Sequence, residues 1–214
     1  MQERFYRVIA SQLRRPSGRF GRWVMTRALN QGNAELIEGS LGALELRPDD
    51  RYLDAGFGGG RSIELAAKTI DLGHIYGVDY SSDMVTHGQR RFRKLIQEGR
   101  LSLLAGDFLD LPFRDHLMSA VSTINTIYFW AEPPATLSSF RRILRPGGRL
   151  AVGFSGAEKT RAYAALTHSD FRHVQAEEVV ALVSAAGFDA VRALPQRGKV
   201  SRGDFAVVAQ RADE

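Results

Sequence analysis

Short apolar runs alternate with segments of helical spacing through the middle of the chain. Five of the runs have the length and composition of strands, at 51–56, 74–80, 101–107, 117–127 and 149–155. Several are unbroken apolar stretches, which is typical of strands that are buried on both faces of a sheet. Strands that alternate with helices predict right-handed βαβ units and a parallel sheet with helices on both faces.

The segments between these strands predict helices over 60–71, 82–98 and 135–144. For the second of them we expect Ser82 or Asp83 as the N-cap, because a short side-chain oxygen can accept a hydrogen bond from a free amide of the first turn. The alternation of strands and helices then gives way to a different pattern at the C-terminal end.

The C-terminal part of the chain predicts one more helix followed by a hairpin. The helix is expected over 175–186, with acidic residues in its first turn where the helix dipole favours them, and with Gly187 as its C-terminal cap. The apolar runs 188–194 and 204–210 are close enough to pair as a hairpin joined by a glycine-containing loop.

The N-terminal part predicts helices that precede the alternating pattern. Residues 3–15 form an amphipathic pattern whose polar side is rich in arginine, and a second helical stretch is expected over about 20–45, with a break near residue 32. The sequence therefore predicts a helical extension over 1–46 and one α/β domain over 47–214.

Composition narrows the class of protein. Of the 214 residues, 44% are hydrophobic and 25% are charged, as in ordinary globular domains. The absence of cysteine excludes disulfides, thiolate metal sites and cysteine nucleophiles. No apolar run approaches the roughly 20 residues that span a bilayer, and the first residues lack the continuous apolar core of a secretory signal. We therefore expect a cytoplasmic protein.

The net charge of +5 is concentrated at one end of the chain. Residues 1–30 carry seven arginines and one acid, a local charge of +6, so the remaining residues sum to −1. A basic segment of this kind is compatible with a lid that packs over a site, with nucleic acid as a partner, or with peripheral contact of residues 3–15 with an anionic membrane surface. Packing as a lid is the interpretation that we favour.

A glycine-rich turn follows the first predicted strand, with the sequence DAGFGGG at 54–60. Such a turn lets the backbone approach a ligand closely and presents the amides of a helix N-terminus to it. The dinucleotide fingerprint G-x-G-x-x-G would need a third glycine at one of two positions, where the chain has Arg61 and Ile63. The pattern present is D-x-G-x-G-x-G.

This turn resembles motif I of the class I S-adenosylmethionine (SAM) methyltransferases. Three more segments resemble that family in the same order, GVDYSSDM at 77–84, AGDFLDLPF at 105–113 and ILRPGGRL at 143–150, and together they cover about residues 50–155. The match is to the broad small-molecule branch. The resemblance implies a Rossmann-like seven-stranded sheet of order 3-2-1-4-5-7-6, with the last strand antiparallel, and SAM as the cofactor.

The resemblance also implies roles for individual residues. Asp54 would order the methionine amino end of SAM, Asp79 would accept hydrogen bonds from the two ribose hydroxyls, and Asp107 would bind the adenine amine. The full set of expected cofactor-binding residues is Asp54, Gly56, Gly58, Gly60, Asp79, Tyr80, Met84, Asp107, Phe108 and Asn125.

The end of the fourth strand is the expected substrate side. Methyltransferases that act on the amino groups of bases carry two prolines here, between an acid or amide and an aromatic residue. In this chain Thr126 and Ile127 stand between Asn125 and Tyr128, which argues against methylation of adenine or cytosine amines. Tyr128 is the first candidate for catalytic contact with the substrate. His168 is the second, with a solvated loop histidine as the alternative.

These observations predict a SAM-dependent methyltransferase that acts on an oxygen, nitrogen or carbon atom of a small organic molecule. Two alternatives stay open, an RNA or protein methyltransferase that uses the basic N-terminal segment and a catalytically silent SAM-binding protein. No pair of histidines has the spacing of a helical zinc site, so no metal is expected. The expected oligomeric state is a monomer or a homodimer.

Overall fold

The computed structural model describes residues 33–161, 172–198 and 200–213, and these form a single seven-stranded sheet in the order β3-β2-β1-β4-β5-β7-β6. The strands are β1 (Arg51–Ala55), β2 (His74–Asp79), β3 (Leu101–Ala105), β4 (Met118–Ile124), β5 (Leu144–Ser155), β6 (Phe188–Pro195) and β7 (Asp204–Arg211). β1 to β5 pair in parallel, and β7 runs antiparallel to both β5 and β6. The predicted strand order, the antiparallel last strand and the C-terminal hairpin are confirmed.

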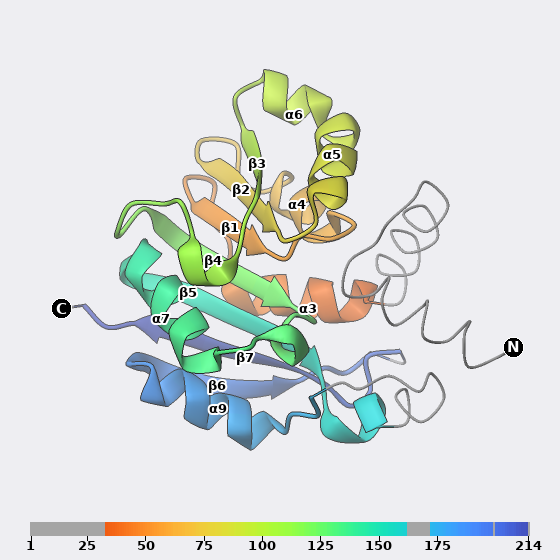
Figure 1. Cartoon of the computed structure of the whole chain (residues 1–214), viewed down its shortest axis with the longest axis vertical. Helices are drawn as coiled ribbons and strands as arrows, with labels where there is room; N and C mark the ends of the chain where they lie inside the picture. Colours follow the sequence, from red (N-terminus) through yellow and green to blue (C-terminus); the bar gives the residue numbers. More distant parts are fainter. Residues whose placement is uncertain (1–32, 162–171, 199, 214) are drawn as a thin grey trace, which may run out of the picture.

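Helices cover both faces of this sheet (Figure 1). On one face lie α3 (Ala34–Leu44), α4 (Arg61–Ala66) and α5 (Ser82–Arg91), and on the other lie α7 (Pro133–Ile143) and α9 (Ala176–Ala185). The shorter elements are α6 (Arg93–Gln97), η1 (Phe108–Asp110) and η2 (Ile127–Phe129), and residues 157–161 after β5 are also helical.

Two apolar cores, one on each face, follow from the alternation of side chains along the strands. On β1, Tyr52 faces the core under α3 and α4, whereas its neighbour Leu53 faces the core under α7 and α9. Both side chains are completely buried, as are Ile63 of α4 and Phe140 of α7. Burial on both faces explains why the strands appear in the sequence as nearly continuous apolar runs.

Helix α3 packs directly on the sheet, although it lies inside the predicted N-terminal extension. Its residues Leu36 and Leu44 are each 1% exposed, and the helix contacts β4, β5 and β7. The last helix of the extension 1–46 is therefore part of the α/β sandwich. The predicted amphipathic helix over 3–15 lies outside the described residues.

Two local predictions are corrected. The single helix expected over 82–98 is divided at Phe92, which has φ −103° and ψ 23° and turns its ring into the core. The N-cap of α5 is Ser81 rather than Ser82 or Asp83, because the Ser81 hydroxyl accepts a hydrogen bond from the Met84 amide at 3.4 Å. The helix expected over 175–186 is confirmed, with Gly187 in the left-handed conformation after its end.

Candidate functional site

A cavity of about 340 Å³ opens at the carboxyl ends of β1, β2 and β4. In open α/β sheets this edge is where ligands bind. The parallel register brings Ala55 of β1 opposite Val78 of β2 and Thr123 of β4, so the residues that follow these three strands meet at one place. Nine of the ten predicted cofactor-binding residues line the cavity, namely Asp54, Gly56, Gly58, Asp79, Tyr80, Met84, Asp107, Phe108 and Asn125.

The glycines of the turn after β1 have two different tasks. Gly56 has φ +83°, and a Cβ there would lie 2.5 Å from the Thr126 methyl group, so this position needs glycine for both conformation and space. Gly60 does not line the cavity. A Cβ on Gly60 would lie 2.5 Å from the ring of Phe92, on the side of the core. The structure therefore gives Gly60 a packing role instead of the predicted contact with the cofactor.

Asp79 stands at the end of β2 with its carboxylate fixed by backbone amides. Its Oδ2 accepts from the amide of Gly58 at 2.9 Å, and its Oδ1 accepts from the amide of Ser81 at 2.9 Å. Burial raises the pKa of Asp79, and these two amides act in the opposite direction. An ionised carboxylate offers about four acceptor sites, so two sites remain for the hydroxyls of a cis-diol.

Asp54 is a buried acid at the end of β1, 1% exposed. Burial raises the pKa of Asp54 to about 7, the hydroxyls of Ser62 and Ser122 lower it, and the charge of Asp79 raises it further. Within the described part of the chain, its Oδ2 has no hydrogen-bond partner. A buried carboxylate oxygen of this kind is costly unless it meets a donor, and an ammonium group would supply one.

Residues that follow β2 and β3 form another part of the cavity lining. Asp107 caps η1, since its Oδ1 accepts from the Leu109 amide at 3.0 Å. Phe108 packs against Phe140 with ring centroids 5.7 Å apart. Tyr80 is 65% exposed and Leu109 is 47% exposed, although both line the cavity. Two apolar side chains with free faces at a cavity mouth can enclose a flat ring between them.

Asn125 follows β4 in the left-handed conformation, with φ +55°, and lines the cavity. Tyr128 does not line it. The Tyr128 hydroxyl shares its one proton between two acceptors, Asn125 Oδ1 at 3.0 Å and the Ser155 carbonyl oxygen at 3.1 Å, and its oxygen accepts from the Ser155 amide at 2.5 Å. Burial raises the pKa of Tyr128 well above its ordinary value. Tyr128 is therefore not placed for the contact with substrate that the sequence predicted. The other candidate, His168, lies outside the described residues.

Comparison with known proteins agrees with this geometry. Residues 53–152 match the model of a family described as a methyltransferase domain. Residues 53–152 therefore form a domain of the class I SAM-dependent methyltransferases. The sheet order is the one that the sequence resemblance implied, and the matched range contains all nine of the predicted cofactor-binding residues that line the cavity.

Individual relatives of the chain extend the comparison. The demethylmenaquinone methyltransferase of Symbiobacterium thermophilum is 36% identical over 104 residues, which are 48% of this chain and 41% of that protein. The chain spans less than half the length of the curated relatives that it matches. A solved complex of the Haloferax volcanii Trm112 methyltransferase activator with a methyltransferase contains a chain with a TM-score of 0.78 at 21% identity, covering 87% of this chain and 93% of that one. Geranyl diphosphate methyltransferase with SAM gives a TM-score of 0.69 at 17% identity and covers 92% of both chains. These two likenesses show the fold.

SAM is the cofactor of this family, and the cavity fits it. The unpartnered Asp54 oxygen suits the ammonium of the methionine part, and the fixed Asp79 carboxylate suits the ribose diol. Among the described residues, no three potential ligands are grouped as a metal site would require. None of the described helices has both the length and the hydropathy needed to cross a membrane.

Several residues that line the cavity were not assigned to it from the sequence. Thr126 accepts a hydrogen bond from Trp130 Nε1 at 3.0 Å, and together with Phe129 and Trp130 it forms the wall after β4. Aromatic residues after a strand are as compatible with core packing as with a cavity wall, so the sequence alone did not assign Phe129 and Trp130 to the cavity. Ile37 reaches the cavity from α3, and only the tertiary packing of that helix reveals it. In the sequence, the apolar spacing around Ile37 predicted only that this residue packs in the core.

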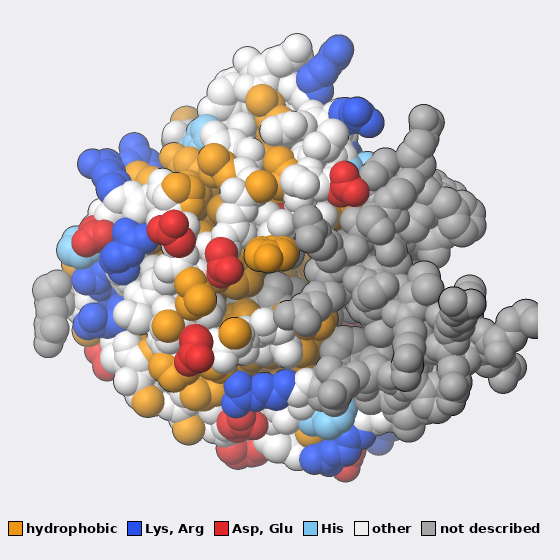
Figure 2. All heavy atoms as spheres, in the orientation of Figure 1, with side chains coloured by type: hydrophobic (Ala, Val, Ile, Leu, Met, Phe, Trp, Pro, Cys, Tyr) orange, Lys and Arg blue, Asp and Glu red, His pale blue; other side chains and the backbone are white. Residues whose placement is uncertain are grey.

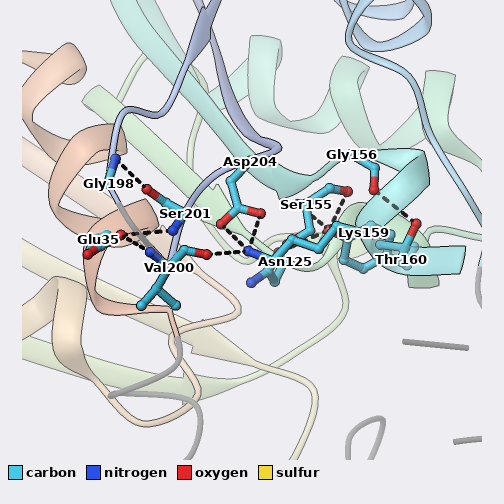
Figure 3. A network of polar contacts seen from close by, with 11 residues as sticks. Glu35, Asn125, Ser155, Gly156, Lys159, Thr160, Gly198, Val200, Ser201 and Asp204 are labelled. Carbon is cyan, nitrogen blue, oxygen red and sulfur yellow. Dashed lines mark hydrogen bonds and ion pairs between the residues drawn. The ribbon is translucent and has the colours of Figure 1, made fainter. Parts of the chain in front are cut away.

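A polar network joins the elements beside Asn125 (Figure 3). Lys159 donates to both oxygens of Asp204 at 2.7 and 2.8 Å and to the Val200 carbonyl at 2.8 Å. From α3, Glu35 accepts from the amides of Val200 at 2.9 Å and Ser201 at 2.8 Å. The loop between β6 and β7 is thereby tied to α3 and to the segment after β5, which gives this side of the site a firm support.

Proposed function

We propose that this chain transfers a methyl group from SAM to an oxygen, nitrogen or carbon atom of a small organic molecule. One observation carries the proposal: a single cavity is lined both by the two acids Asp54 and Asp79 and by an apolar wall. The wall is formed by Ile37, Phe129 and Trp130. The acids suit the two ends of SAM that need acceptors, and the wall suits an acceptor molecule with an apolar body.

SAM supplies a methyl group on a sulfonium that is already a good leaving group. The residues of the chain therefore have to bind and orient. Asp54 and Asp79 fix two distant parts of one ligand, which sets the direction in which the methyl group points. The apolar wall of Ile37, Phe129 and Trp130 excludes water from the path of the incoming nucleophile. Alignment and exclusion of water together can lower a barrier by several kcal/mol.

Proton removal is needed only where the accepting atom must lose a proton. Asp54 is assigned to the cofactor, and the Tyr128 hydroxyl is occupied by Asn125 and Ser155. His168 therefore stays our predicted base for an acceptor that ionises on methylation. A carbon or amine nucleophile would not need it.

The class of acceptor is supported by the cavity wall and by the relatives. The matched demethylmenaquinone methyltransferase is named for a quinone, a flat and largely apolar molecule. On the described face shown in Figure 2, acidic and basic side chains are interspersed with apolar ones. We therefore propose an apolar small molecule as the acceptor and a cytoplasmic location for the reaction.

Radiolabelled SAM offers a direct test of the acceptor class. The full chain would be incubated with labelled SAM and, separately, with reduced naphthoquinones and simple phenols, with a mixed RNA, and with a basic protein such as histone. Label in a small-molecule fraction, lost in the Asp79→Ala variant, is the expected result. Label that enters only RNA or protein would contradict the proposal in favour of the macromolecular alternative.

A further inference from the structure

The side-chain amide of Asn125 is held in one orientation at the edge of the cavity. Its backbone amide donates to the Gly153 carbonyl at 2.8 Å, which anchors the left-handed residue to β5. Its Oδ1 accepts from the Tyr128 hydroxyl at 3.0 Å. Within the described residues, the structure records no partner for its Nδ2.

Tyr128 is itself fixed on two sides. Its hydroxyl is bonded to both the amide and the carbonyl of Ser155, and its ring lies edge-on to Phe129 with centroids 6.2 Å apart. Asn125 and Ser155 belong to the same group of polar contacts in Figure 3. The ends of β4 and β5 therefore hold the tyrosine hydroxyl, and the hydroxyl holds the amide.

The donor and acceptor atoms of the side-chain amide that are not used by Tyr128 determine which ligand group Asn125 can bind. A carboxamide has one oxygen that accepts and one NH₂ group that donates twice. Because Tyr128 uses the oxygen, the group left for the cavity is the NH₂. Asn125 is thus a donor toward the cavity, suited to an oxygen-bearing group and unsuited to an ammonium.

The place of this donor relative to Asp54 identifies the ligand group. β1 and β4 are paired in parallel, with Asp54 opposite Ser122, so Asn125 follows β4 beside the turn that follows Asp54. The methyl group of Thr126 sits directly against Gly56 in that turn. An acceptor for ammonium and a donor for carboxylate at adjacent strand ends are complementary to the two charges of a free α-amino acid.

We propose that Asn125 donates to the methionine carboxylate of SAM and that Tyr128 is the positioning residue that orients its amide. The inference rests on the proposed function, since it requires SAM or its product as the ligand. It replaces the contact between Tyr128 and substrate that the sequence predicted, and it gives the tyrosine a task in cofactor binding through Asn125.

Calorimetry with two ligands tests the role of Tyr128. S-Adenosylhomocysteine carries the amino-acid end, whereas methylthioadenosine has the same nucleoside without it. In Tyr128→Phe we expect about fivefold weaker binding of S-adenosylhomocysteine, as for the loss of one hydrogen bond, and unchanged binding of methylthioadenosine. Tyr76→Phe is the matched control, because Tyr76 packs between His74 and Phe113 outside the cavity. It should leave both affinities unchanged.

Substitutions of Asn125 test the direction of the hydrogen bond. Asn125→Asp replaces the donor by a charged oxygen, so it should weaken S-adenosylhomocysteine binding more than Asn125→Ala does, by at least about tenfold relative to wild type. If Tyr128 acts through the amide, Tyr128→Phe should add no further loss in the Asn125→Ala background.

The outcomes separate this inference from the function on which it rests. A wild-type chain that binds neither ligand contradicts the proposed function itself. A wild-type chain that binds S-adenosylhomocysteine while Asn125→Asp binds it equally well or more tightly contradicts only the inference, because the amide would then face its ligand with oxygen. Equal losses of both ligands in Tyr128→Phe would also overturn it, since they indicate general damage to the site.

Discussion

Burial raises the pKa of Asp54 to about 7. The affinity of the site for a ligand with an ammonium group should therefore increase with pH. At pH 6 most Asp54 side chains carry a proton that must leave before the carboxylate can pair with an ammonium. At pH 8 most are already ionised. S-Adenosylhomocysteine should therefore bind about tenfold more tightly at pH 8 than at pH 6.

Calorimetry at the two pH values checks this prediction, with Asp54→Asn as the control. The asparagine does not titrate, so the affinity of the variant should be low and nearly independent of pH. A wild-type affinity that is equal at pH 6 and pH 8 would show that Asp54 is ionised in the free protein or does not meet the ammonium.

The turn between β1 and α4 shows how one element serves both binding and packing. Gly56 and Gly60 both have positive φ, at +83° and +76°, but only Gly56 lines the cavity. We expect alanine at either position to destabilise the fold by about 1–3 kcal/mol, because the backbone is strained and a neighbour must move. Gly56→Ala should in addition weaken S-adenosylhomocysteine binding at least about tenfold, because the strain and displacement then fall on the binding surface.

The two variants are a matched pair in thermal unfolding and calorimetry. Gly60→Ala should unfold at a lower temperature and yet bind with nearly wild-type affinity at a temperature where it is folded. A loss of affinity in Gly60→Ala as large as that in Gly56→Ala would return Gly60 to the cofactor site, where the sequence pattern placed it.

A buried ion pair ties α3 to the sheet far from the cavity. The Arg149 guanidinium meets both oxygens of Asp50 at 2.6 Å and donates to the Leu44 carbonyl at 3.0 Å. Asp50 is 1% exposed, so Arg149→Met should cost about 3–5 kcal/mol of unfolding free energy by leaving this acid without its cation.

Chemical denaturation measures that cost, with Arg145→Met as the control at an exposed position on the same strand. The control should change the unfolding free energy by less than about 0.5 kcal/mol. If Arg149→Met changed the unfolding free energy as little as the control, α3 would be held to the sheet by apolar packing alone. The proposed contribution of the Arg149–Asp50 ion pair would then be wrong.

Over the whole molecule, patterns that repeat along the chain predicted the structure well. The alternation of strands and helices and the four motifs predicted the sheet order and nine of the cavity residues, because each depends on local periodicity or on the parallel register of strand ends. Contacts between distant segments were not predictable. Tyr128 bonds to Ser155, which lies on another strand, and the ring that crowds Gly60 belongs to Phe92, beyond the next strand. The net charge is also unevenly distributed, because residues 1–30 carry a local charge of +6 and the remaining residues sum to −1.

The central claim is that this sheet edge binds SAM through Asp54 and Asp79. Calorimetry of the full chain with S-adenosylhomocysteine at pH 8, beside the Asp79→Ala variant, tests it most directly. The account predicts a dissociation constant on the order of micromolar for the wild type and binding at least about tenfold weaker for the variant, which loses a charged acceptor of two hydroxyls. No binding by a folded wild-type chain, or equal affinity in a folded Asp79→Ala chain, would contradict it.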